Sequence, residues 1–166
     1  MVNVNKNITK VCSFYASDWH FITMLLPHIN AKIDEKSKIT TILEEDAQDK
    51  VEILLGKLKL NNTERILNIG WKNKELNKEN LEKVIEKSLE TENLEIIISG
   101  SKEYIKEVNT IIEKSVELHN IENEIRIINC YSVEDNLNIK EILEKHEIVL
   151  NTAGEKSSKE FMKSIM

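Results

Sequence analysis

Apolar residues in this chain alternate between short β-like runs and longer stretches with helical spacing. The clearest case is residues 11–29, where a β-branched and aromatic run passes through a polar turn at Ser17 and Asp18 into an amphipathic stretch. Apolar side chains recur there at every third or fourth position, which predicts a helix with one buried stripe. Ser17 or Asp18 can cap this helix, and Pro27 inside it removes one backbone hydrogen bond and predicts a kink.

The same order of strand and helix repeats about six times along the chain. Strands are predicted at residues 11–15, 38–43, 65–71, 94–98, 125–131 and 147–151. Helices are predicted for the stretch after the first turn and at residues 44–60, 80–89, 103–119, 139–145 and 159–166. This alternation predicts right-handed βαβ crossovers and a mainly parallel sheet between two helix layers, a three-layer α/β sandwich. One or both of the late strands could run antiparallel.

Length and composition predict one α/β domain over residues 1–166, with residues 1–10 as a lead-in to the first strand. A net charge of -6 opposes direct nucleic-acid binding, which needs a basic surface. No apolar run approaches the roughly 18 residues of a membrane span, so we expect a cytoplasmic protein without membrane contact. Cys12 and Cys130 lie in strand-like runs, which favours buried free thiols over a redox pair.

Ligands of open α/β sheets bind outside the carboxyl ends of the strands. The residues that follow the predicted strands mix aromatic, hydroxyl and carboxylate side chains, which suits a small organic molecule with an apolar body and a few polar groups. They can equally be ordinary polar turn residues without a ligand. The candidate ligand-binding residues are Tyr15, Asp18, Trp19, Trp71, Tyr131 and His146.

Motifs for nucleotide, metal and nucleophile chemistry are missing from the sequence. It contains no GxGxxG after the first strand and no P-loop, and residues 99–104, SGSKEY, hold one glycine where a phosphate loop needs several. The four histidines are scattered without metal-ligand spacing, so we expect neither a metal site nor a cofactor. Glu44, Glu45 and Asp46 are expected to be charges at a helix start rather than general acids or bases. We identify no catalytic residue, and enzymatic activity is unsupported but open.

Two stretches together resemble the MEDS family of sensory domains, named for methanogens, methylotrophs and the dichloromethane-responsive regulator. Residues 12–33, CSFYASDWHFITMLLPHINAKI, resemble the family's FY pair, acidic turn and helix with a late proline. Residues 125–150, IRIINCYSVEDNLNIKEILEKHEIVL, resemble its late Cys-x-Tyr strand end, short helix and His before the last strand. The resemblance implies a degenerate RecA- or KaiC-like domain without a working P-loop, used in signal transduction and proposed to sense small hydrocarbon derivatives.

We therefore expect a non-catalytic sensory or regulatory domain that binds a small organic ligand or a regulatory partner protein at the carboxyl edge of its sheet. One alternative is a degenerate RecA-like nucleotide-binding protein or weak ATPase. Another is a protein-interaction or assembly module, and self-association into a homo-oligomer stays open. The feature that suggests an assembly module is the amphipathic final segment, with Phe161, Met162 and Ile165, which can pack either on a partner or on the core of its own chain.

Overall fold

The computed structural model describes residues 7–73, 78–88 and 93–165. Six strands of the described residues form one sheet in the order β2-β3-β4-β1-β5-β6. They are β1 (Ile8–Tyr15), β2 (Lys38–Leu43), β3 (Asn93–Ser99), β4 (Glu124–Ser132), β5 (Ile148–Asn151) and β6 (Gly154–Ser157). Strands β1 to β5 run parallel, and β6 pairs antiparallel with β5. The mainly parallel sheet that the sequence predicts is therefore present.

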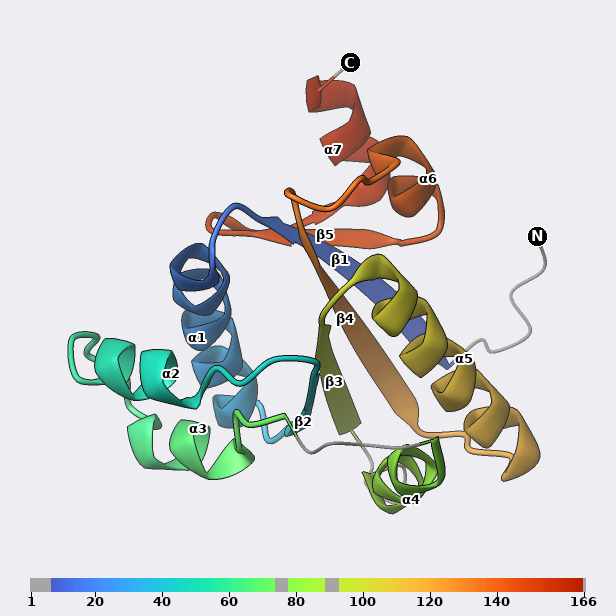
Figure 1. The fold of residues 1–166 in the computed structure, drawn as a ribbon, viewed down its shortest axis with the longest axis horizontal. Helices are drawn as coiled ribbons and strands as arrows, with labels where there is room; N and C mark the ends of the chain where they lie inside the picture. The colour runs from blue at the N-terminus through green and yellow to red at the C-terminus, as the bar shows by residue number, and fades with distance from the viewer. Residues whose placement is uncertain (1–6, 74–77, 89–92, 166) are drawn as a thin grey trace.

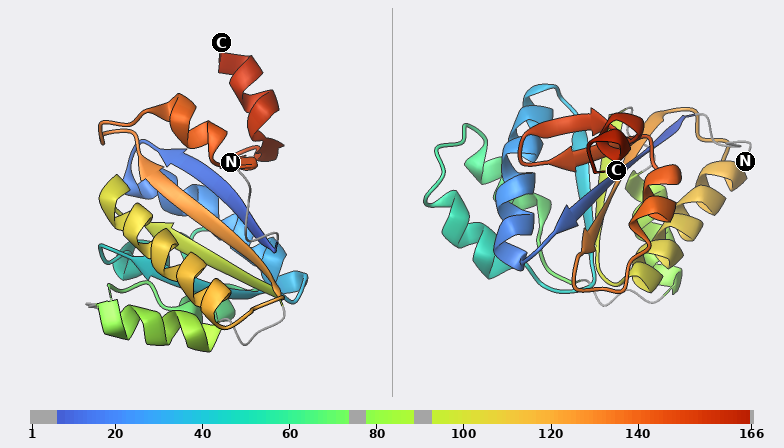
Figure 2. Two further views of the ribbon diagram at one scale, coloured as in Figure 1. Left: turned by 90° about the vertical axis from the view of Figure 1, so that its right-hand side faces the viewer. Right: turned by 90° about the horizontal axis from the view of Figure 1, so that it is seen from above.

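Helices cover both faces of this sheet (Figure 1). Their bounds are α1 (Asp18–Asp34), α2 (Gln48–Leu55), α3 (Thr63–Ile69), α4 (Lys78–Ser88), α5 (Lys102–Leu118), α6 (Ile139–Glu144) and α7 (Ser158–Ile165). Helices α1, α2 and α3 lie on one face and α4, α5 and α6 on the other, with the sheet between them as Figure 2 shows. This arrangement is a three-layer α/β fold.

Each face of the sheet carries its own buried apolar cluster. On one face, apolar residues of α1 between Phe21 and Ile29 pack against the side chains that β1, β3 and β4 direct toward this helix. On the other face Ile105, Val108 and Ile112 of α5 pack against the alternate side chains of the same strands. Residues 94–98 of β3 are all buried, as expected for an interior parallel strand covered on both faces. Ser17 caps α1 by accepting a hydrogen bond from the His20 backbone N–H at 3.1 Å, so the predicted cap is confirmed.

The prediction of a strand at residues 65–71 is wrong. This stretch forms α3 and ends at Gly70, whose φ of 91° favours glycine. Its apolar residues are too few to separate a period of 2 from one of 3.6, and tertiary contacts decide the outcome. Asn62, just before α3, donates its backbone N–H to the Asn30 side chain of α1 at 3.0 Å, and Ile66 is fully buried.

Several boundaries also differ from the predictions. Strand β1 begins at Ile8, which is 3% exposed, so only residues 1–7 precede it, and residues 1–6 lie outside the described part. Helix α2 ends at Leu55 rather than at residue 60. The antiparallel strand is β6, which the sequence pattern did not reveal because its four residues are largely exposed and polar. The predicted helix ends at Leu89 and Met166 fall outside the described residues.

Both cysteines are fully buried and free, as predicted. Cys12 belongs to the cluster under α5 and Cys130 to the cluster under α1, so the two thiols lie on opposite faces of the sheet. Burial raises the pKa of Cys12 to about 12. The thiols are therefore protonated at neutral pH and poor nucleophiles. Within the described residues, no helix combines the length and apolarity needed to cross a membrane.

Candidate functional site

The carboxyl ends of β1, β2, β3 and β4 surround a cleft of about 420 Å³. Helices α1 and α2 leave β1 and β2 toward one face, whereas α5 and α6 leave β3 and β4 toward the other. Chain segments that diverge from neighbouring parallel strands open a crevice between them, and this is where ligands of such sheets bind. The topology thus places the cleft at the strand ends where a site was expected.

Carboxylates dominate the rim of this cleft. Its lining includes Asp18, Glu44, Glu45, Asp46, Glu134 and Asp135. Among the described residues one lysine lines the cleft, Lys50, whose Nζ lies 2.6 Å from Asp18 Oδ2. The buried wall consists of Tyr15, Phe21, Ile22 and Leu43. The cleft therefore combines an apolar wall with a negatively charged mouth.

Tyr15 supplies the polar group of the wall. Its hydroxyl lies 3.3 Å from Ser99 Oγ, which connects the end of β1 to the end of β3, and its ring lies 5.0 Å from that of Phe21. Burial raises the pKa of Tyr15; the hydrogen bond to Ser99 opposes this, and the nearby charges of Asp18 and Asp135 add to it. The phenol is therefore protonated at neutral pH and can donate a hydrogen bond to a ligand.

The Glu44 carboxylate lies at the start of α5. Its Oε1 accepts the Ser101 backbone N–H at 2.8 Å, at the start of α5. A Cβ on Gly100 would lie 2.8 Å from Glu44 Cβ and 2.7 Å from Tyr104 Cδ2, so glycine is needed for this approach. The single glycine of residues 99–104 thus admits a carboxylate of the chain itself. The expectation that Glu44 marks the start of the next helix is corrected, because α2 begins only at Gln48.

Trp19 lies on the surface beside the cleft. Its side chain is 42% exposed, and Lys50 Nζ lies 5.8 Å from the centre of its ring. Since Lys50 also pairs with Asp18, these three side chains connect the first turn of α1 to α2. Trp19 does not belong to the cleft lining itself.

Trp71 is part of the core instead of the cleft. It is fully buried, its Nε1 donates to the Ile66 carbonyl at 2.9 Å, and its backbone N–H donates to the Gln48 side chain at 3.2 Å. It packs where α2 and α3 meet the core cluster under α1. The structure therefore leaves this residue no surface on which a ligand could rest.

Tyr131 and His146 lie together, but on the opposite face of the sheet from α1. They are 8% and 6% exposed, and their rings meet edge to face with centroids 6.1 Å apart. His146 Nδ1 lies 2.6 Å from the Ile142 carbonyl and Nε2 lies 2.9 Å from Asn129 Nδ2. Asn129 is bound in turn by Asn109 of α5 at 2.8 Å. Burial lowers the pKa of His146 to about 4, so this satisfied network holds a neutral imidazole and ties three elements together.

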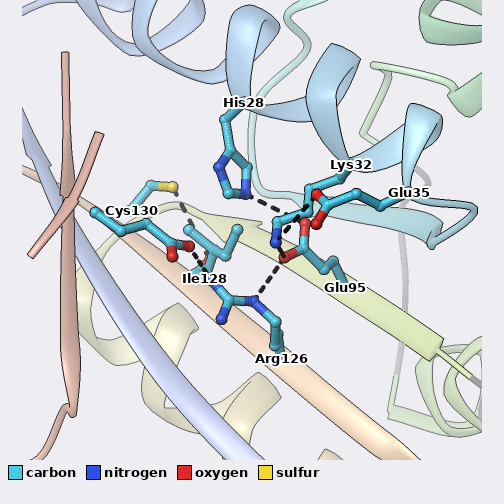
Figure 3. Close-up of polar contacts among 8 residues, drawn as sticks. His28, Lys32, Glu35, Glu95, Arg126, Ile128 and Cys130 are labelled. Atoms are coloured by element: carbon cyan, nitrogen blue, oxygen red, sulfur yellow. Dashed lines mark hydrogen bonds and ion pairs between the residues drawn. The ribbon is translucent and has the colours of Figure 1, made fainter. Parts of the chain in front are cut away.

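A buried ionic cluster around Glu95, shown in Figure 3, was not expected from the sequence. Glu95 is 1% exposed, and its carboxylate lies 3.2 Å from His28 Nε2 and 2.7 Å from Arg126 Nε. Lys32 Nζ is 4.0 Å away, and Arg126 also pairs with Glu155. Burial raises the pKa of Glu95, but the His28 hydrogen bond and the surrounding cations outweigh it and lower the pKa overall. The signal was present as one acid inside the apolar run of β3.

This cluster and the cleft occupy different ends of the sheet. Glu95 and Arg126 are each the third residue of their strands, near the amino ends. Within residues 7–73, 78–88 and 93–165, no group of three His, Cys, Asp or Glu side chains could hold a metal ion.

Comparisons of the chain with protein-family models, with curated proteins and with solved structures find no match.

Proposed function

We propose that this chain is a non-catalytic sensory or regulatory domain that binds a small organic cation in the cleft at the carboxyl ends of β1 to β4. The observation that supports this most is the charge of the cleft, which six carboxylates line. Asp18, Glu44 and Asp46 already have polar partners, whereas Glu45, Glu134 and Asp135 join no ion pair among the described residues. An ammonium group gains Coulomb energy at such a mouth, and the wall of Tyr15, Phe21 and Ile22 accommodates an apolar body. The cleft volume of about 420 Å³ suits a small molecule.

A ligand switches such a domain only through unequal affinity for two conformations. The turn after β1 is the part best placed to differ between them. The Val133 backbone N–H donates to the Tyr15 carbonyl at 2.9 Å, which joins this turn to the loop that carries Glu134 and Asp135. A cation between Asp18 and Asp135 would draw both loops together and present a changed surface to a partner protein.

We also propose that the chain is a member of the MEDS family and has a RecA-like origin. A mainly parallel sheet with β1 inside it and helices on both faces supports both. The Phe14-Tyr15 pair that carries part of the resemblance ends β1 at the cleft. We expect this chain to share its fold and the position of its site with that family. The acidic side chains of this chain would determine which ligand it binds.

The nucleotide-binding alternative and the assembly-module alternative receive less support. A polyphosphate would meet six carboxylates in the cleft, and Glu44 already binds the start of α5. Phe161 and Met162 of α7 are half-buried and pack on the core under α5, so this face of the final helix is covered by its own chain. The side chain of Ile165 lies outside the described part.

Thermal-shift titration with small primary and quaternary amines tests the proposal. We expect amines to raise the Tm, since a ligand at 100 times its Kd adds roughly 2.7 kcal/mol of stability. The double variant Glu45→Gln, Asp135→Asn removes two charges of the rim and is expected to raise the Kd at least about tenfold. Tyr15→Phe is expected to weaken binding while keeping the fold.

Glu117→Gln on the exposed side of α5 is the matched control and leaves amine binding unchanged. A rise in Tm with ATP and magnesium that the Glu45→Gln, Asp135→Asn variant abolishes would favour the nucleotide-binding alternative. If no amine raises the Tm at millimolar concentration, the proposal is wrong.

A further inference from the structure

A second and larger hollow, of about 780 Å³, lies at the amino end of β2. We call it the β2 groove. Four elements border it: the turn after α1, the first residues of β2, α3 and α4. Its position at the amino end of the strand separates it from the acidic cleft, which lies at the carboxyl ends.

The β2 groove is basic in an otherwise acidic protein. Lys36, Lys38, Arg65 and Lys87 line it, and its lining contains no Asp or Glu among the described residues, although the net charge of the chain is -6. None of these four cations joins an ion pair with the residues that the structure describes. These four cations are exposed, so solvent screens their mutual repulsion, and a bound anion would reduce it further.

Asp34 and Glu35 precede Lys36 in the sequence, Glu64 precedes Arg65, and Glu86, which precedes Lys87, lies 3.2 Å from His119 Nε2. Asp34 accepts a hydrogen bond from Asn62 Nδ2 at 2.9 Å, and Glu35 Oε2 lies 3.5 Å from Lys32 Nζ. Among the described residues, none of these acids lines the groove, so its described lining carries a net positive charge.

Lys36 stands at a backbone position that favours glycine. Its φ is 65°, and the backbone hydrogen bonds from Lys36 to Ile33 and from Ser37 to Lys32 form a Schellman motif at the end of α1. A side chain in this left-handed conformation costs free energy that glycine would not. A lysine held there against local preference, on the rim of a basic groove, points to a role for its charge.

We propose that the β2 groove binds a small organic molecule with a phosphate group or several carboxylates. The guanidinium of Arg65 can bind such an oxyanion with two parallel hydrogen bonds, and the three lysines add charge. Ile33, Ile39 and Ile69 provide an apolar surface for the organic part. The volume of about 780 Å³ lies within the range of small-molecule sites.

Isothermal titration with pyrophosphate and, separately, with citrate at low ionic strength tests this inference. We expect heat of binding that weakens as sodium chloride is added, because the contacts are ionic. Arg65→Gln is expected to raise the Kd at least about tenfold. Binding of pyrophosphate alone assigns the site to phosphates, binding of citrate alone assigns it to carboxylates, and binding of both shows general recognition of oxyanions.

Lys36→Gly gives a readout that a merely structural role would not produce. It is expected to raise the Tm, because the backbone strain is relieved, and at the same time to weaken anion binding. Asn120→Gly is the matched control, since Asn120 has a φ of 48° in the equivalent motif after α5 and lies outside the groove. It should raise the Tm without changing the Kd, and Lys140→Gln on α6 should change neither.

Three results would overturn the inference: no heat with either anion, binding that both Arg65→Gln and Lys36→Gly leave intact, or binding of a hexaglutamate peptide but of neither small anion. The last would assign the groove to an acidic protein partner. Amine binding at the acidic cleft is expected to be the same in Arg65→Gln as in the wild type, so failure here and failure of the proposed function are distinguishable.

Discussion

Glu95→Gln is expected to lower the free energy of unfolding by about 3–5 kcal/mol, the largest effect that we predict for a single substitution. The glutamine keeps the size of the side chain but removes the charge that Arg126, Lys32 and His28 surround. Arg126 would keep Glu155 as a partner, which places the expected loss toward the lower end of this range. Urea denaturation followed by circular dichroism measures it.

Glu117→Gln is the matched control on the surface, where the same substitution should change stability by no more than about 0.5 kcal/mol. A triple variant, His28→Leu, Glu95→Leu, Arg126→Leu, is expected to recover most of the loss, because apolar residues can replace a buried ionic cluster at little cost. A loss below about 1 kcal/mol in Glu95→Gln would show that solvent screens this carboxylate.

Acidification from pH 7 to pH 4 is expected to lower the free energy of unfolding by about 3 kcal/mol through His146 alone. Its pKa falls from 6.5 to about 4 in the folded protein, so in this interval the unfolded chain binds the proton and the native state does not. Stability is fully present above pH 6.5 and is lost progressively toward pH 4; each unit of pKa difference contributes about 1.4 kcal/mol. A proton on Nε2 would face the Asn129 amide, which already donates there.

The His146→Gln variant isolates this effect, because the other three histidines of the chain remain. Its stability should be lower at pH 7 and should fall less steeply between pH 6.5 and 4 than that of the wild type. Glu95 has a lowered pKa and adds its own loss, which begins as the pH approaches 4.5, where the unfolded chain takes up the proton, and ends when the native carboxylate is protonated. Equal slopes in the two proteins would mean that His146 is protonated without cost in the native state.

Local pattern predicted most of the strands and helices well. Residues 38–43 form β2 with both ends as expected, because its Ile and Thr residues are β-branched and the turn before it is polar. The helix after Ser17 begins where its capping side chain predicts. Residues 65–71 failed, since a short apolar run suits either period and the contact of Asn62 with Asn30 lies outside any local window.

The residues of the candidate site were also predicted only in part. Tyr15 and Asp18 do line the cleft. Tyr15 ends β1 and Asp18 follows it, and the alternation of strands and helices already predicted where the carboxyl end of this strand lies. Trp71 was expected there because it ends an apolar run, but that run forms α3 up to Ile69, and Trp71, which follows Gly70, is fully buried in the core. Tyr131 sits at a strand end as expected, yet its side chain points to the other face of the sheet.

By itself the sequence determined most of the strands and helices, the apolar stripe of the long helices and the free state of both cysteines, since these follow from composition and period along one element. The tertiary structure alone decided which side chains meet. The strand order β2-β3-β4-β1-β5-β6 brings Glu44 to Ser101, His28 to Glu95 and Asn129 to His146 across separations that no local period encodes. The same order gathers carboxylates at one end of the sheet and leaves four cations around the amino end of β2.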